Sequence, residues 1–207
     1  VAPFINSHFF NPEKPQTIFS GETWKKKAPN QPFFAYANLE TGKAHGFNAA
    51  RIYAKENGIS VDPAKVDIPP YLVDTIKWRD TIAKSLDSIS HTDYVIGKFL
   101  KSLKDAGLEE NTLVMIATDH GRDSMRHKQW LYDSGINVPL MLRWPGHIKA
   151  GTVIDELTSL IDVAPTSIAA AGLTVPPKME GLDLLQADLS KRQYVYISRD
   201  SVDGTFD

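Results

Sequence analysis

A carboxylate and an imidazole, those of Asp119 and His120, follow a short unbroken apolar run at residues 113–117 after one intervening threonine. The length and β-branched content of this run predict a strand buried on both faces, as in a parallel sheet. Open α/β sheets bind ligands at the carboxyl ends of their strands, and Gly121 lets the backbone turn sharply there. An oxygen and a nitrogen ligand at that position predict a metal site, although His120 could instead donate a hydrogen bond to an anionic oxygen. The simpler alternative is that Asp119 caps the next turn and His120 faces solvent.

The polar segment at residues 122–129 is rich in cationic groups: Arg122, Arg126, His127 and Lys128. Several positive charges beside a metal suit an anionic substrate, because they stabilise the negative charge that develops in a transition state. We place Arg126 and His127 among the substrate-binding residues. The alternative interpretation is an exposed basic loop.

Three sequence blocks resemble, in the same order, the sulfatase family of the alkaline phosphatase superfamily: TLVMIATDHG, HKQWLYDSGINVPLMLRWPG and SLIDVAPTSIAAAG. In that family an Asp-Asn or Asp-His pair at a strand end binds a divalent cation, normally Ca2+. The resemblance therefore implies Asp119 as a metal ligand, with His120 as a second ligand or a donor to the nucleophile. It also implies a catalytic role for Lys128, which keeps the family spacing to the turn at residues 132–135. The resemblance extends back through residues 32–107.

A second expected strand, at residues 33–39, leads into a loop that contains Lys43 and His45. In sulfatases the matching loop carries a His or Lys that contacts the sulfate and the leaving oxygen. The resemblance thus implies His45 as a catalytic residue and Lys43 as the substrate-binding alternative. Many family members instead place a Thr-His or Pro-His dipeptide closer to the strand, so an exposed loop histidine stays an open interpretation.

The family nucleophile is a formylglycine, made from Cys or Ser in a C/S-x-P-x-R motif near the start of the enzyme. This chain has no cysteine and no such motif, and the family's early Asp-Asp metal pair is missing. We expect a partial sulfatase-type catalytic domain over residues 1–207, inactive alone, that needs the N-terminal half of its own domain as a partner. A catalytically dead relative is the alternative. Within the chain, residues 1–31 predict an irregular loop and residues 32–207 a portion of the α/β core.

The expected fold class is α/β, as part of an alkaline phosphatase-like, mostly parallel sheet flanked by helices. Periodicity and stop signals predict helices at residues 47–57, 74–106 and 162–172, the last capped by Asp162. Further strands are expected at residues 138–144 and 194–198. Asp93 lies on the apolar stripe of the long helix, which predicts a buried hydrogen-bond acceptor.

Composition limits the classes of partner. The formal net charge of −2 over 207 residues gives no electrostatic footprint for nucleic acid. No apolar run approaches the length of a membrane span, and the first ten residues lack the pattern of a signal peptide. The absence of cysteine leaves the compartment undecided, and the resemblance implies a periplasmic, secreted or lysosomal protein.

The activity implied by the resemblance is hydrolysis of a sulfate ester or sulfamate in a small sulfated molecule such as a sulfated sugar. The segments PPYLVDT and WLYDSG are most similar to the heparan N-sulfatase-like branch. One alternative is a phosphodiesterase or phosphomutase-type metalloenzyme of the same superfamily, with a Ser or Thr nucleophile. A non-catalytic sugar-binding relative is another.

Overall fold

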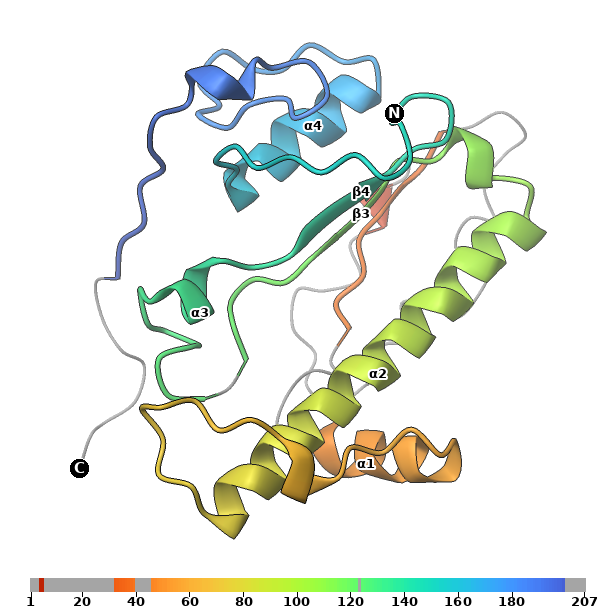
Figure 1. Ribbon diagram of the computed structural model, residues 1–207. Coiled ribbons are helices and arrows are strands. Elements are labelled where there is room, and N and C mark those ends of the chain that lie inside the picture. Colours follow the sequence, from red (N-terminus) through yellow and green to blue (C-terminus); the bar gives the residue numbers. More distant parts are fainter. Residues whose placement is uncertain (1–3, 6–31, 40–45, 123, 200–207) are drawn as a thin grey trace. The chain divides into compact units, whose positions relative to one another are not determined.

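The computed structural model describes residues 4–5, 32–39, 46–122 and 124–199 (Figure 1). The chain divides into two compact units, residues 1–108 and 109–207, which are described separately below. The described helices are α1 Phe47–Glu56, α2 Ile76–Asp105, α3 Asp133–Ile136 and α4 Val163–Ala170, and the strands are β1 Phe4–Ile5, β2 Phe34–Ala35, β3 Val114–Ala117 and β4 Leu140–Arg143. None of the described helices combines the length and apolarity that a membrane span requires.

In the first unit, α1 packs against the long helix α2 (Figure 1). Ala50 and Ala54 of α1 are fully buried, and their small side chains let the two helix backbones approach closely. Thr75 begins α2, because its hydroxyl oxygen accepts a hydrogen bond from the free backbone N–H of Trp78 at 3.2 Å. Gly107, at φ 68°, ends the helix in the left-handed conformation that glycine adopts without strain. The two helices predicted at residues 47–57 and 74–106 are therefore confirmed.

Asp87, and not Asp93, is the buried carboxylate of α2. Asp87 is fully buried and accepts hydrogen bonds from Arg51 Nη1 at 2.6 Å and from the backbone N–H of Val61 at 2.8 Å. Asp93 is exposed, so its prediction as a buried acceptor is wrong. The face of α2 that meets α1 runs through residues 83, 87, 91 and 94 in three- and four-residue steps, and residue 93 lies off this face.

The strand pair of the first unit is short. β1 and β2 pair in parallel, with Phe4 opposite Phe34 and Ile5 opposite Ala35. The strand expected at residues 33–39 thus has ladder bonds at two residues only. Residues 4–5 are the only part of the segment 1–31 that the structure describes, and they are extended rather than irregular.

In the second unit, β3 and β4 form an antiparallel pair with Val114 opposite Arg143 and Ala117 opposite Leu140. The expectation that this strand lies in a parallel sheet is therefore wrong for its pairing with β4. The chain between the two strands closes on itself, since the N–H of Gly121 donates to the carbonyl of Gly135 at 3.1 Å. β4 consequently starts where β3 ends and runs back along it, as in a wide hairpin.

The burial expected for β3 is also not observed. Val114, Met115 and Ile116 are half-buried, because β3 pairs with β4 alone among the described strands and a two-stranded sheet leaves side chains accessible. The strand expected at residues 194–198 is absent as well. Tyr194 and Tyr196 there are 64% and 89% exposed, and no ladder partner lies beside them within the described residues.

The helix expected at residues 162–172 is confirmed as α4, but Asp162 does not cap it with its side chain. The carboxylate is fully buried, and it accepts hydrogen bonds from the backbone N–H groups of Ser159 and Leu182, both at 2.8 Å. Arg192 adds two charged hydrogen bonds, at 2.6 and 2.8 Å. Burial alone would raise the pKa of Asp162, but these hydrogen bonds and the Arg192 charge outweigh burial and hold the pKa below its ordinary value. Asp162 thus ties the segment at residues 182–192 to α4.

Candidate active site

Five of the predicted site residues lie on the loop at residues 118–139, between β3 and β4: Asp119, His120, Arg126, His127 and Lys128. Its path is defined by close backbone contacts at two glycines. A Cβ atom on Gly121 would lie 2.0 Å from the carbonyl oxygen of Ser134, and one on Gly135 would lie 2.1 Å from that of Trp130. The N–H of Lys128 also donates to the carbonyl of Arg122 at 3.1 Å. The loop therefore folds back on itself, and glycine is required at both crossings because no side chain fits there.

Asp119 and His120 project from the carboxyl end of β3 and lie close to each other. Their Oδ2 and Nε2 atoms are 3.6 Å apart, the Asp119 side chain is 87% exposed, and the His120 side chain is 37% exposed. His120 Nδ1 lies 2.6 Å from the carbonyl oxygen of Gly121. Because a carbonyl can only accept, Nδ1 donates this hydrogen bond, and Nε2 is the ring nitrogen on the side of the Asp119 carboxylate.

This arrangement fits two ligands of one divalent cation. Histidine ligands in proteins commonly donate their second ring N–H to a carbonyl or carboxylate, as His120 does here. Divalent cations lie about 2.0–2.6 Å from their ligand atoms, so a carboxylate oxygen and an imidazole nitrogen 3.6 Å apart can share one. Among the described residues no group of three or more His, Asp or Glu side chains surrounds such an ion. Calcium takes about 6–8 ligands, so Asp119 and His120 supply only part of a coordination shell.

The three basic residues Lys128, Arg126 and His127 differ in exposure and in their contacts. Lys128 is exposed, which leaves its ammonium group accessible to an anionic ligand. Arg126 is exposed too, and its guanidinium carbon lies 5.0 Å from the ring centre of Tyr132. His127 is partly buried, and its Nε2 accepts a hydrogen bond from Arg122 Nε at 3.4 Å. The loop thus presents Lys128 and Arg126 outward and turns His127 inward.

His127 orients Arg122 through this bond. Burial lowers the pKa of His127 below the ordinary value of 6.5, and the charge of Arg122 lowers it further, against a smaller opposite effect from the backbone of Ser134. A neutral imidazole is the form that can accept a hydrogen bond from a guanidinium. The geometry gives His127 an orienting role that its residue type alone did not reveal.

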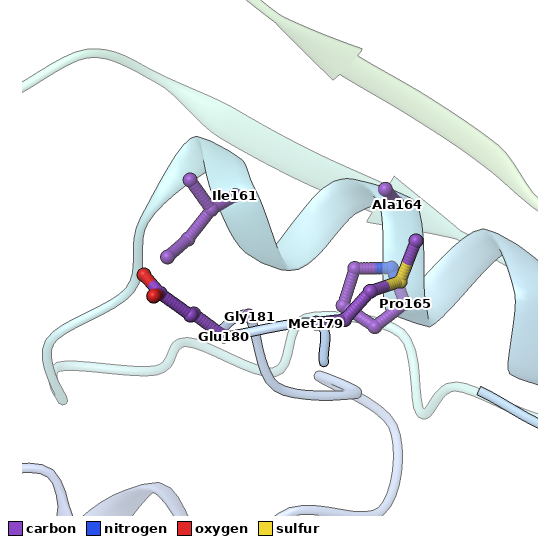
Figure 2. A pocket seen from close by; sticks show the side chains of 6 residues that line it. All are labelled: Ile161, Ala164, Pro165, Met179, Glu180 and Gly181. Carbon is purple, nitrogen blue, oxygen red and sulfur yellow. The ribbon is translucent and has the colours of Figure 1, made fainter. Parts of the chain in front are cut away.

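The structure does not place the remaining two candidate residues. Lys43 and His45 lie outside the described residues. Convergence of Asp119, His120, Lys128 and His45 on one pocket therefore stays a prediction. A cavity of about 360 Å3 beside α4 and another of about 490 Å3 at the turn after β4 are lined by other residues. Figure 2 shows the cavity beside α4 and the side chains that line it: Ile161, Ala164, Pro165, Met179, Glu180 and Gly181.

Comparison with known proteins shows the family of the chain. The family model described as Sulfatase matches residues 16–173, most of the chain. The chain belongs to the sulfatase family. It is 30% identical over 217 aligned positions to the ulvan-active sulfatase of Formosa agariphila, a match that covers 89% of this chain and 36% of that protein. It is 33% identical over 183 positions to human N-acetylgalactosamine-6-sulfatase, with 81% of this chain and 30% of the relative covered.

Solved structures show the same fold. A sulfatase chain from Bacteroides thetaiotaomicron matches with a TM-score of 0.60 and 23% identity, over 84% of this chain and 38% of that one. The yidJ protein of Bacteroides fragilis matches with a TM-score of 0.62 and 23% identity, over 83% and 38%. The expected α/β, alkaline phosphatase-like class is confirmed. The chain spans about a third of the length of the two curated relatives named above.

Proposed function

We propose that this chain supplies the cation-binding strand end and the sulfate-binding loop of an enzyme that hydrolyses sulfate esters or sulfamates. The observation that supports the proposal most directly is the Asp119–His120 pair, whose carboxylate and Nε2 atom lie 3.6 Å apart at the end of β3 in a sulfatase-family chain. The names of the curated relatives refer to sulfatases of ulvan and of N-acetylgalactosamine 6-sulfate, so a sulfated carbohydrate is the proposed substrate class.

Each residue of the chain has a proposed task. Asp119 and His120 hold the cation, which we take to be Ca2+ because the aspartate offers hard oxygen and the chain has no thiolate. When bound, the cation would draw negative charge from the sulfate oxygens. Lys128 places its ammonium group against a sulfate oxygen and stabilises the charge that grows there. The imidazole of His45 would protonate the leaving oxygen, and Lys43 would contact the sulfate.

The nucleophile is not among these residues. Formylglycine derives from Cys or Ser in a C/S-x-P-x-R motif, and the 207 residues contain neither a cysteine nor that motif. No residue of this chain fits that group. We therefore expect the 207-residue polypeptide by itself to release no sulfate, and we assign to it the cation and sulfate side of the site only.

The test compares Lys128→Ala with Asp119→Asn in the full-length protein. Lys128→Ala should lower kcat for sulfate release by about 100-fold or more, the size seen when one stabilising donor is lost, and should leave the bound calcium unchanged. Asp119→Asn should instead lower calcium occupancy, measured by elemental analysis. Lys149→Ala, which removes an exposed lysine after β4, is the matched control.

Normal turnover by the Lys128→Ala protein would contradict the role of Lys128. Release of phosphate from aryl phosphates without release of sulfate from any sulfated carbohydrate would instead favour the phosphodiesterase-type alternative.

A further inference from the structure

Two half-exposed aromatic rings and two guanidinium groups form one cluster on the loop that carries Lys128. The ring centres of Trp130 and Tyr132 are 6.3 Å apart with a tilt of 40°, and the residues are 42% and 48% exposed. The guanidinium carbon of Arg199 lies 4.6 Å from the ring centre of Trp130, and that of Arg126 lies 5.0 Å from the ring centre of Tyr132. We call these four residues the aromatic ledge.

The stacking positions the charged groups. A cation is attracted to the face of an aromatic ring, which limits the conformations of a long arginine side chain. A guanidinium has five N–H donors in one plane, and this fork matches the oxygens of a sulfate or carboxylate. The ledge therefore combines apolar ring surface with oriented anion donors.

The backbone of the same loop is held in an unfavourable conformation. Arg126 and Gln129 have φ angles of 63° and 68°, and among the described residues they are the only non-glycine residues with positive φ. Such backbone is unfavourable for a non-glycine residue, and it concentrates at binding and catalytic sites. Ser134 holds the strained position, since its hydroxyl donates to the carbonyl of Arg126 at 2.5 Å.

The position of the ledge relates it to the proposed reaction. Trp130 follows Lys128 by two residues, and Gly135 packs closely against the backbone carbonyls of His127 and Trp130, on either side of Lys128. A pyranose ring offers an apolar C–H face that stacks on an aromatic ring, and its sulfate or carboxylate groups need cationic donors. A sugar ring with anionic substituents, next to the one that carries the reacting sulfate, satisfies both parts of the ledge.

We propose that the aromatic ledge of Arg126, Trp130, Tyr132 and Arg199 binds the neighbouring sugar ring of an anionic oligosaccharide and so sets the preference for oligosaccharides over monosaccharides. This proposal rests on the proposed sulfate hydrolysis. Sequence reasoning named Arg126 as a substrate-binding residue but missed the other three. The available signal was a pair of aromatic residues two positions apart in an otherwise polar loop.

The experiment measures kcat/KM of the full-length protein for a sulfated monosaccharide and for a disaccharide with the same reacting ring and a carboxylated or sulfated neighbour. Trp130→Leu and Arg199→Gln should each lower the disaccharide-to-monosaccharide ratio about tenfold, the size expected for one charged or stacking contact. Tyr196→Leu and Lys178→Gln are the controls, since they remove an exposed ring and an exposed charge elsewhere in the same unit. Their ratios should match the unsubstituted protein.

An unchanged ratio in the ledge variants, or an equal fall in the controls, overturns the proposal. If Trp130→Leu fails to fold, Arg199→Gln decides, because Arg199 lies in a segment without regular secondary structure. If the full-length protein releases no sulfate from either saccharide, the proposed function fails and the ledge is tested by equilibrium binding of the intact disaccharide. A dissociation constant about tenfold higher for Arg199→Gln than for Lys178→Gln then supports the ledge, and equal constants overturn it.

Discussion

Removing the positive partner of Asp162 should loosen one part of the fold by an amount that the structure allows us to calculate. Arg192 is 10% exposed, and its guanidinium donates two hydrogen bonds to a carboxylate that is fully buried. Breaking a buried ion pair from one side costs about 3–5 kcal/mol, because the remaining charge stays buried without its partner. Two backbone N–H groups, from Ser159 and Leu182, still bind the carboxylate in Arg192→Ala. We therefore expect the lower end, about 3 kcal/mol.

Hydrogen exchange of a single backbone amide measures this loss of stability in the segment concerned. The amide of Leu182 donates to Asp162 and should exchange only when the segment opens. A loss of about 3 kcal/mol corresponds to exchange faster by about 100-fold, since 1.4 kcal/mol is a factor of ten. The neighbouring Lys191→Ala is the matched control: Lys191 pairs with Asp188 at 3.1 Å, and these side chains are 81% and 54% exposed. That exposed pair should leave the exchange rate unchanged.

The pH dependence provides a second check on the same pair. The pKa of Asp162 is lowered from 3.8, so the carboxylate contributes stability above that pH and loses it as pH falls through the folded-state pKa. The difference between the unsubstituted protein and Arg192→Ala should therefore be full at pH 7 and shrink below about pH 4. Equal exchange rates in Arg192→Ala and Lys191→Ala at pH 7 would refute the assignment of a buried, structural ion pair.

Two further predictions concern the loop between β3 and β4. Gly135→Ala should destabilise the protein and lower turnover, because its Cβ would lie 2.1 Å from the carbonyl oxygen of Trp130. The control is Gly97→Ala in α2, whose Cβ meets no atom within 4 Å and which should stabilise the protein by about 0.5–1 kcal/mol. A loss of stability in both variants would contradict this reasoning. The imidazole of His127 should titrate below 6.5 in an NMR experiment, and Arg122→Gln should raise the midpoint by removing a nearby positive charge. Because the unfolded chain takes up this proton first, stability should decrease as pH falls through about 6.5; a midpoint above 6.5 would contradict the burial of the ring.

Local rules in the sequence determined the helices and the family. The apolar steps of three and four residues, the cap at Thr75 and the glycine at position 107 define α2 without reference to the rest of the chain. The Asp119–His120 pair at the end of an apolar run likewise indicated the proposed site, since these residues follow the strand closely in sequence. Such features depend on neighbours a few positions apart, which is why a single sequence contains them.

Only the tertiary structure decided which residues far apart in the sequence contact each other. An apolar run predicts a strand but not the direction of its neighbour, so the antiparallel pairing of β3 with β4 followed only from the crossing of Gly121 and Gly135. Periodicity placed Asp93 on the apolar stripe of α2, whereas packing against α1 buried the carboxylate of Asp87 instead. The contact between Arg199 and Trp130 joins residues 69 positions apart. Contacts of this kind depend on how distant segments pack, and the pattern of any one segment does not contain that information.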